Sequence, residues 1–275
     1  MEIFEILKAV LFGVVEGITE WLPISSTGHM ILLDEVVKLQ VSASFMEMFL
    51  VVIQLGAIMA VVLLYWKKLL PISLKEKPMI KRNTLSLWGK IIVACIPAAI
   101  IGFLFEDILY RYFYNFQTVA IALIVFGILF IVIENYNKKR IPVVTEIDHL
   151  SYKTTFLIGL FQVIAAIFPG TSRSGATILG GILLGTSRTV AAEFTFFLAV
   201  PVMLGASLLK LSKFGLTFTG FELSILWVGL VVSFVVSVIA IKFLMSYIKK
   251  HDFKIFGWYR IVLGIIVLIF FLFLR

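Results

Sequence analysis

The sequence predicts an all-α integral membrane protein: an inverted repeat of six transmembrane helices and two broken, re-entrant helical hairpins. Three observations predict this fold class. Hydrophobic residues make up 61% of the 275 residues and the mean hydropathy is +1.10, whereas soluble domains are about 45–50% apolar. Several apolar runs are long enough to cross a bilayer. Two further apolar segments are interrupted by proline and hydroxyl residues and resemble each other.

Six apolar runs predict six simple spans. A helix needs about 20 mostly apolar residues to cross the hydrocarbon core. The runs that meet this length are 45–66, 86–105, 116–134, 190–209, 222–245 and 257–274.

Two segments, 3–33 and 154–184, are long enough to span the membrane but are broken in the middle. The first is interrupted by LPISS at 22–26, and the second by PGTSRSG at 169–175. Proline removes an N–H group and clashes with the preceding helical turn. Irregular backbone at membrane depth is tolerated only inside protein or beside water. We therefore expect re-entrant helix–loop–helix hairpins.

The two broken segments indicate an internal repeat. An offset of 146 residues pairs Glu16 with Gln162, Pro23 with Pro169, and Ser26 with Ser172. Downstream, FLVVIQLGA at 49–57 resembles FLAVPVMLGA at 197–206. Residues 1–140 and 141–275 then each hold one hairpin followed by three spans, within one membrane domain. Because three is odd, the second repeat must be inverted relative to the first.

The basic residues predict the orientation. Loops 67–85, 135–153 and 246–256 carry most of the lysine and arginine outside the spans, and such loops face the cytoplasm. Both termini would then lie outside, and the hairpin tips would meet near the midplane. The formal charge of +8 is therefore read as topology and contact with anionic lipid, and no nucleic-acid partner is expected.

Glu16 and Glu20 are four residues apart, so a helix would place them on one face. Such a carboxylate pair can bind a hard divalent cation, Mg²⁺ or Ca²⁺, or can act as acid and base. The alternative is two glutamates that face water near the interface. A further acid, Glu193, is expected to snorkel or to pair with Arg188.

The hydroxyl-rich break that follows, Ser25–His29, offers a nucleophile and a base, or a histidine that attacks phosphorus itself. Its alternative role is to cap a helix. In the second break, Arg173 at membrane depth must find an anion or water, and its forked donors suit phosphate oxygens. Arg173 could also pair with Glu16 or Glu20 as a structural bridge, and that pair could form before a substrate arrives.

The segments GVVEGITEWLPISSTGH and PGTSRSGAT resemble the two signature motifs of the undecaprenyl-diphosphate phosphatase family of the bacitracin-resistance type. The resemblance extends through EFTFFLAVPVMLGA at 193–206 and WYR at 258–260. It implies hydrolysis of undecaprenyl diphosphate to the monophosphate, which recycles the lipid carrier of bacterial cell-wall synthesis and confers bacitracin resistance. It also implies a divalent cation and a site open to the outer side. The working residues that it implies are Glu16, Glu20, Ser26, His29 and Arg173.

The predicted site combines both breaks in a bacterial plasma membrane. Its expected catalytic residues are Glu20, Ser26, His29 and Arg173. Its expected phosphate-binding residues are Ser25, Thr27, Gly170, Thr171, Ser172 and Ser174. Its expected metal ligands are Glu16 and Glu20.

The order of events in that site stays open. Ser26 could be the nucleophile with His29 assisting, His29 could be nucleophile or acid, or Glu20 could orient an attacking water. The expected partners are a polyprenyl diphosphate and membrane lipid, with a homodimer as one alternative for assembly. A secondary transporter is the rival function, because inverted repeats and broken helices are typical of transporters.

Overall fold

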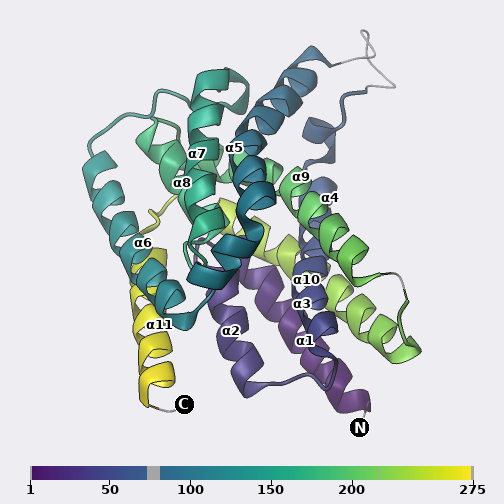
Figure 1. Ribbon diagram of the computed structural model, residues 1–275. Coiled ribbons are helices and arrows are strands. Elements are labelled where there is room, and N and C mark those ends of the chain that lie inside the picture. Colours follow the sequence, from purple (N-terminus) through teal and green to yellow (C-terminus); the bar gives the residue numbers. More distant parts are fainter. Residues whose placement is uncertain (1, 73–80, 216, 274–275) are drawn as a thin grey trace.

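The computed structural model describes residues 2–72, 81–215 and 217–273, and helices dominate this part of the chain (Figure 1). Its α-helices, in order, are α1 (Glu2–Thr19), α2 (Ser26–Val36), α3 (Ala43–Val52), α4 (Gln54–Leu69), α5 (Arg82–Phe113), α6 (Phe116–Asn137), α7 (Tyr152–Ile167), α8 (Arg173–Leu183), α9 (Arg188–Phe214), α10 (Gly220–Tyr247) and α11 (Lys254–Phe273). A single 3₁₀ turn, η1 (Ile147–His149), precedes α7.

Six helical segments of the described chain are long and apolar enough to cross a membrane. They are Ala43–Leu69, Arg82–Phe105, Phe116–Asn137, Arg188–Phe214, Gly220–Tyr247 and Lys254–Phe273. Five of them contain a predicted run in full, and Lys254–Phe273 contains 257–273 of the run 257–274. The prediction of a multi-pass, all-α membrane protein is therefore confirmed. Helix α5 continues to Phe113 and α9 to Phe214. Both helices therefore extend beyond residues 105 and 209, where the apolar runs predict the spans to end.

Both broken segments are helix–break–helix units in the structure. In each break a serine precedes the second helix with a left-handed backbone, φ +74° at Ser25 and +69° at Ser172. The Ser25 hydroxyl accepts a hydrogen bond from the Gly28 N–H, and the Ser172 hydroxyl accepts one from the Gly175 N–H. The two breaks therefore share one cap geometry.

The shared cap corrects the register of the repeat. Ser25 and Ser172 occupy equivalent positions, so the predicted match of Ser26 with Ser172 is wrong by one residue. The reason is local: Pro169-Gly170-Thr171-Ser172 holds one residue more than Pro23-Ile24-Ser25.

Close helix packing fixes the first broken segment against the rest of the protein. Helix α1 packs along α10, and α4 packs against the same helix. Gly13 and Gly17 face α10 so closely that an added Cβ would meet Gly229 O at 2.8 Å or Val236 Cβ at 2.8 Å. Small residues at such a spacing let membrane helices approach closely, and here they set where the end of α1 lies.

The two broken segments enter the fold from different ends in Figure 1, where α1 and α2 lie in the lower half and α7 and α8 in the upper half. The N and C labels both lie at the lower edge. This placement agrees with the predicted inversion, while the position relative to a bilayer stays a prediction.

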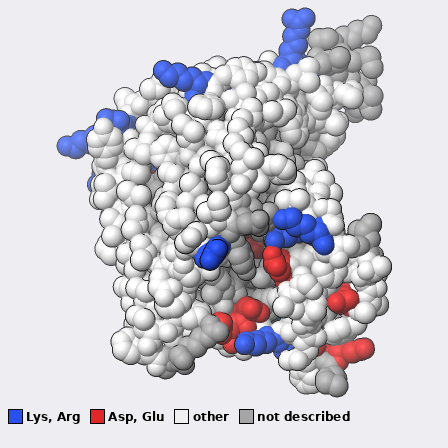
Figure 2. All heavy atoms as spheres, viewed as in Figure 1, with Lys and Arg blue, Asp and Glu red and all other residues white. Residues whose placement is uncertain are grey.

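Charge is distributed unevenly over the molecule. Figure 2 shows lysine and arginine side chains along the upper end of the visible face, and charges of both signs around a hollow in its lower half. Residues 73–80 of the predicted basic loop 67–85 lie outside the described part of the chain, and they include the charged residues Lys75, Glu76 and Lys77.

The expected pairing of Glu193 with Arg188 is wrong. Lys68 reaches Glu193 from α4, with 2.5 Å between Lys68 Nζ and Glu193 Oε1. Arg188 instead donates from Nε and Nη2 to the buried carboxylate of Glu134 on α6. Both pairs join helices distant in sequence, so local spacing could not identify them.

Candidate functional site

Glu20 lies at the centre of the site, in the break after α1. Its Oε2 accepts a hydrogen bond of 2.8 Å from the Ser26 hydroxyl. Its Oε1 accepts one of 2.9 Å from Arg173 Nη2. Ser26 and Arg173 are the first residues of α2 and α8, so the two helix starts bring a hydroxyl and a guanidinium to one carboxylate. The predicted meeting of the two breaks is confirmed.

Arg173 is held in place and still has a free donor. Its Nη1 donates to the Thr195 carbonyl at 2.9 Å, and 13% of its side chain is exposed. Its Nε is buried and has no hydrogen-bond partner within the described structure. A buried donor without a partner is costly, so this N–H is available to an anion that enters the site.

The hydroxyls of the second break mainly organise the loop. Ser174 Oγ donates to the Glu20 carbonyl at 3.1 Å and lies 3.1 Å from Ser172 Oγ. Ser172 also caps α8 through Gly175 N–H. Ser25 has the same capping role on α2. Ser25 and Ser172 therefore cap the helices that follow them.

Arg260 on α11 joins the two breaks and was not among the predicted site residues. It is fully buried. It donates from Nη2 to the carbonyls of Gly170 and Thr171, at 2.9 and 2.7 Å, and from Nη1 to the Pro23 carbonyl at 3.3 Å. An ionisable residue inside an apolar run is the signal that could have identified it.

His29 is tied at both ring nitrogens. Nδ1 lies 2.7 Å from the Ser25 carbonyl and Nε2 lies 2.7 Å from the Tyr259 hydroxyl. A carbonyl only accepts hydrogen bonds, so Nδ1 carries the hydrogen, and Nε2 of a neutral ring accepts from Tyr259. The His29 side chain is not among the residues that line the cavity beside Glu20.

Glu16 is 1% exposed, and its Oε1 has no hydrogen-bond partner among the described residues. A buried carboxylate oxygen without a partner is the type of donor that a hard cation prefers. Both oxygens of Glu20 are already engaged by Ser26 and Arg173. Of the two predicted metal ligands, Glu16 therefore fits a cation directly, whereas Glu20 would have to exchange a partner.

A cavity of about 230 Å³ opens beside these groups. This catalytic cavity is lined by Glu20, Ser26, Thr27, Gln54, Tyr114, Ala165, Ala166, Pro169, Gly170, Ser172, Arg173, Val202, Met203 and Ala206. It contains five groups expected to bind or react with phosphate on sequence grounds: Ser26, Thr27, Gly170, Ser172 and Arg173. Gln54 and Tyr114 were not predicted, because nothing in the sequence around them sets them apart.

A wider vestibule of about 400 Å³ shares five lining residues with the catalytic cavity: Ser26, Thr27, Gln54, Tyr114 and Ala166. Glu16 lines it, and three charged residues of α2, α3 and α9 also contribute: Asp34, Glu47 and Lys210. Thr171 lines neither space. It faces an apolar groove on the other side of the same loop.

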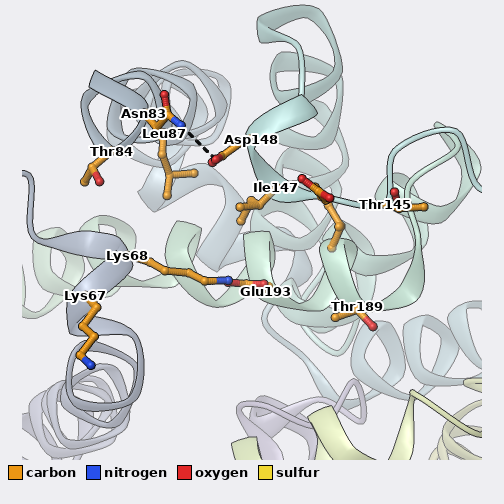
Figure 3. A pocket seen from close by; sticks show the side chains of 12 residues that line it. Lys67, Lys68, Asn83, Thr84, Leu87, Thr145, Ile147, Asp148, Thr189 and Glu193 are labelled. Carbon is orange, nitrogen blue, oxygen red and sulfur yellow. Dashed lines mark hydrogen bonds and ion pairs between the residues drawn. The ribbon is translucent and has the colours of Figure 1, made fainter. Parts of the chain in front are cut away.

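Another pocket of about 400 Å³ lies where α4 ends and α5 and α9 begin (Figure 3). In Figure 3, Lys68 reaches towards Glu193, and Asn83 is joined to Asp148 at 3.2 Å. Three of its charged side chains, Lys68, Glu193 and Asp148, are engaged in these contacts, and among the hydrogen bonds of the described residues none joins a hydroxyl of this pocket to a carboxylate. The chemistry expected of a nucleophile and its base is found beside Glu20 instead.

Comparison with known proteins gives the family. A model of the family described as bacitracin resistance protein BacA matches residues 9–266. An undecaprenyl-diphosphatase of Desulfitobacterium hafniense is 69% identical over 98% of this chain and 98% of its own. An undecaprenyl-diphosphatase of Acetivibrio thermocellus is 60% identical over 98% of this chain and 99% of its own. The chain therefore belongs to the bacitracin resistance protein BacA family.

Proposed function

We propose that this protein is a membrane phosphatase that hydrolyses undecaprenyl diphosphate to undecaprenyl phosphate and inorganic phosphate. That reaction would recycle the lipid carrier of bacterial cell-wall synthesis and confer bacitracin resistance. The observation that carries the proposal is the hydrogen-bonded set of Ser26, Glu20 and Arg173 beside a cavity among membrane helices. Relatives that share 60–69% of the sequence are named for this activity.

The geometry supports Ser26 as the nucleophile. Its hydroxyl already donates to Glu20, so Glu20 can take the proton as Ser26 Oγ attacks the terminal phosphorus. The bond from that phosphorus to the bridging oxygen breaks, and undecaprenyl phosphate leaves. Arg173, with its unpartnered Nε, would bind the transferring phosphoryl oxygens and stabilise their charge.

Water completes the reaction. It attacks the phosphorus of the phosphoserine, and the bond from that phosphorus to Ser26 Oγ breaks. Glu20 returns its proton to Ser26, and both hydrogens of the water leave on inorganic phosphate. The vestibule gives this water a route, because its rim carries charged groups and it reaches Ser26.

His29 positions the start of α2 and does not attack phosphorus. Its Nε2 would have to leave Tyr259 before it could act as a nucleophile. The bond from Nδ1 to the Ser25 carbonyl instead ties the ring to the residue before Ser26. We therefore assign His29 and Tyr259 to positioning of the start of α2.

Glu16, whose buried Oε1 has no hydrogen-bond partner among the described residues, and Glu20 would hold a divalent cation, Mg²⁺ or Ca²⁺. When bound, it would neutralise charge that develops on the phosphoryl group. Glu16→Gln is expected to weaken calcium binding in titration calorimetry and to raise the cation concentration needed for half-maximal turnover. Unchanged binding in this variant would assign Glu16 to structure alone.

The vestibule and both termini are proposed to face the outside of the bacterial cell membrane. A cationic cytoplasmic side supports this orientation. A homodimer stays an expectation, which chemical cross-linking in native membranes would test.

The central test is a chemical trap. Purified protein is mixed with a prenyl diphosphate that carries a labelled terminal phosphate, and is quenched in milliseconds. Wild type is expected to carry label on the peptide that contains Ser26, and Ser26→Ala to lose both label and turnover. Ser44→Ala, an exposed serine, serves as the control.

The possible failures of this test are distinct. Label on His29 would make histidine the nucleophile. Absence of phosphate release from wild type would reject the phosphatase and favour the transporter alternative.

A further inference from the structure

We propose that an apolar groove between α6 and α7 binds the part of the isoprenoid chain next to the diphosphate. The proposal rests on the proposed function and adds where the lipid lies. The groove has a volume of about 360 Å³. It is lined by Phe113, Thr118, Ile121, Ala122, Val125, Phe126, Ile164, Phe168 and Thr171.

The groove is open to the side of the protein. Helix α6 packs against α11 and α8, while α7 packs against α5 and α8, so side chains of α6 and α7 face each other across the groove. Ile121, Val125 and Phe168 are 57%, 45% and 38% exposed. In a bilayer such side chains meet hydrocarbon, so a prenyl chain can pass between membrane and groove without crossing a polar layer.

The groove and the catalytic cavity lie on two sides of one loop. Phe168 and Thr171 line the groove, whereas their neighbours Pro169, Gly170 and Ser172 line the cavity. Gly170 presses this loop directly onto α6, since an added Cβ would meet Val119 O at 2.5 Å. The loop therefore separates the two spaces, and a lipid whose diphosphate is held by Arg173 would have to pass the edge of this loop at Phe168 to reach the groove.

Two aromatic rings stand at this boundary. Phe113 at the end of α5 contacts Phe168 edge-to-face, with 5.1 Å between ring centroids. Next to Phe113, Tyr114 lines the catalytic cavity. The chain would pass this Phe113–Phe168 pair on its way from the cavity to the groove.

The vestibule is the less suitable path for hydrocarbon. Its lining includes apolar side chains such as Met30 and Leu109, but unlike the groove it also carries charged side chains, Asp34, Glu47 and Lys210. Lys210 pairs with Glu47. An apolar chain placed against solvated charges would gain less free energy from burial than one placed against an apolar wall, because the charged side chains would lose water. The two openings would thus serve different molecules. The lipid chain would lie in the groove, and water and inorganic phosphate would pass through the vestibule.

Chain-length selectivity tests the proposal. Val125→Trp would fill the groove, and its matched control is Val132→Trp, on the same helix and 54% exposed but outside the groove lining. The measured quantity is the ratio of kcat/KM for farnesyl diphosphate to that for isopentenyl diphosphate. We expect Val125→Trp to lower this ratio about tenfold, since small changes in apolar contact are worth this much, and Val132→Trp to keep the wild-type ratio.

Opposite results are informative. A wild-type ratio in Val125→Trp would overturn the groove, as would loss of selectivity in the vestibule variant Leu109→Trp instead. Absence of phosphate release by wild type from either substrate would reject the phosphatase itself, so the two failures are distinguishable.

A binding experiment on the unaltered protein gives an answer that does not depend on turnover. The probe is a non-hydrolysable farnesyl methylenebisphosphonate with a photoactivatable diazirine on its first isoprene unit. Peptides from α6 and α7 are expected to be labelled, and unlabelled farnesyl methylenebisphosphonate is expected to remove the label. Competable label on α2 or α3, which line the vestibule, would overturn the assignment.

Discussion

At the scale of the residue, Glu20 holds two partners that the reaction needs separately. Arg173 and Ser26 each occupy one oxygen of the same carboxylate. In the proposed reaction, a phosphoryl group that enters the cavity would compete for Arg173 and would leave Glu20 free to accept the proton of Ser26. The resting ion pair therefore keeps an intramembrane arginine neutralised until an anion replaces the carboxylate.

The fork of Arg173 is expected to matter more than its charge. Lysine would keep the charge but could not reach Glu20 and the Thr195 carbonyl while also offering a free donor. Arg173→Lys should therefore lower turnover by about 100- to 1000-fold, as loss of an aimed donor does elsewhere. The measurement is phosphate release by folded protein, with the exposed Arg111→Lys as the control. If Arg173→Lys had near-normal turnover while Arg173→Ala was inactive, only the positive charge of Arg173 would matter, and not its two-pronged geometry.

At the scale of the residue, the sequence identified polar groups that cluster at a break in an apolar segment. Glu20, Ser26 and Arg173 could be assigned to one site because the polar groups of each break need partners inside the membrane. Arg260 was missed because its partners are backbone carbonyls of distant loops, which no side-chain pattern reveals. Thr171 belonged to the right loop, but the side of that loop it faces depends on the positive φ of +93° at Gly170.

At the scale of the element, the breaks are preorganised helix starts. Ser25 and Ser172 hold a left-handed backbone that non-glycine residues rarely adopt. The hydroxyl of each serine accepts a hydrogen bond that caps the following helix. The side chain of the next residue, Ser26 or Arg173, is directed at Glu20. The existence of both breaks followed from proline and hydroxyl composition, whereas the one-residue shift between them needed backbone geometry.

Close packing of α1 on α10 should control activity from a distance. Gly17→Val would force α1 away from α10, because even a Cβ meets Ser233 O at 2.9 Å and Val236 Cβ at 2.8 Å. Overpacking of this kind costs about 1–3 kcal/mol, and it would displace the end of α1 that carries Glu20. We expect a lower midpoint of thermal unfolding together with lower turnover.

The matched control for this prediction is Gly205→Val on α9, where nothing lies within 4 Å of an added Cβ. Equal effects of the two substitutions would mean that valine harms either helix by itself. The packing argument would then be wrong.

At the scale of the whole molecule, the site combines residues from both predicted repeats, and neither half of the chain holds all of them. Residues 20 and 26 come from the first half and residue 173 from the second. Hydropathy located the six spans because the hydrocarbon core demands them. The ends of α5 and α9 were less predictable, since a helix may continue past the membrane into water.

Orientation in the membrane can be read with two single cysteines in a Cys95→Ser background. We expect an impermeant thiol reagent to label Glu2→Cys in intact cells and to reach Lys139→Cys only after the membrane is opened. The positive-inside distribution is the physical reason. The reverse pattern of labelling would place the vestibule in the cytoplasm.

The hydrogen bonds of Arg260 have a consequence for the order in which the site is completed during protein synthesis. Residue 260 leaves the ribosome after residues 23, 170 and 171, whose carbonyls it binds. Until α11 is inserted, those carbonyls lack their donor and the two loops lack their common support. A nascent chain halted before α11 would already hold Glu20, Ser26 and Arg173, but their two loops would lack the hydrogen bonds that join them through Arg260, and we expect such a chain to be inactive.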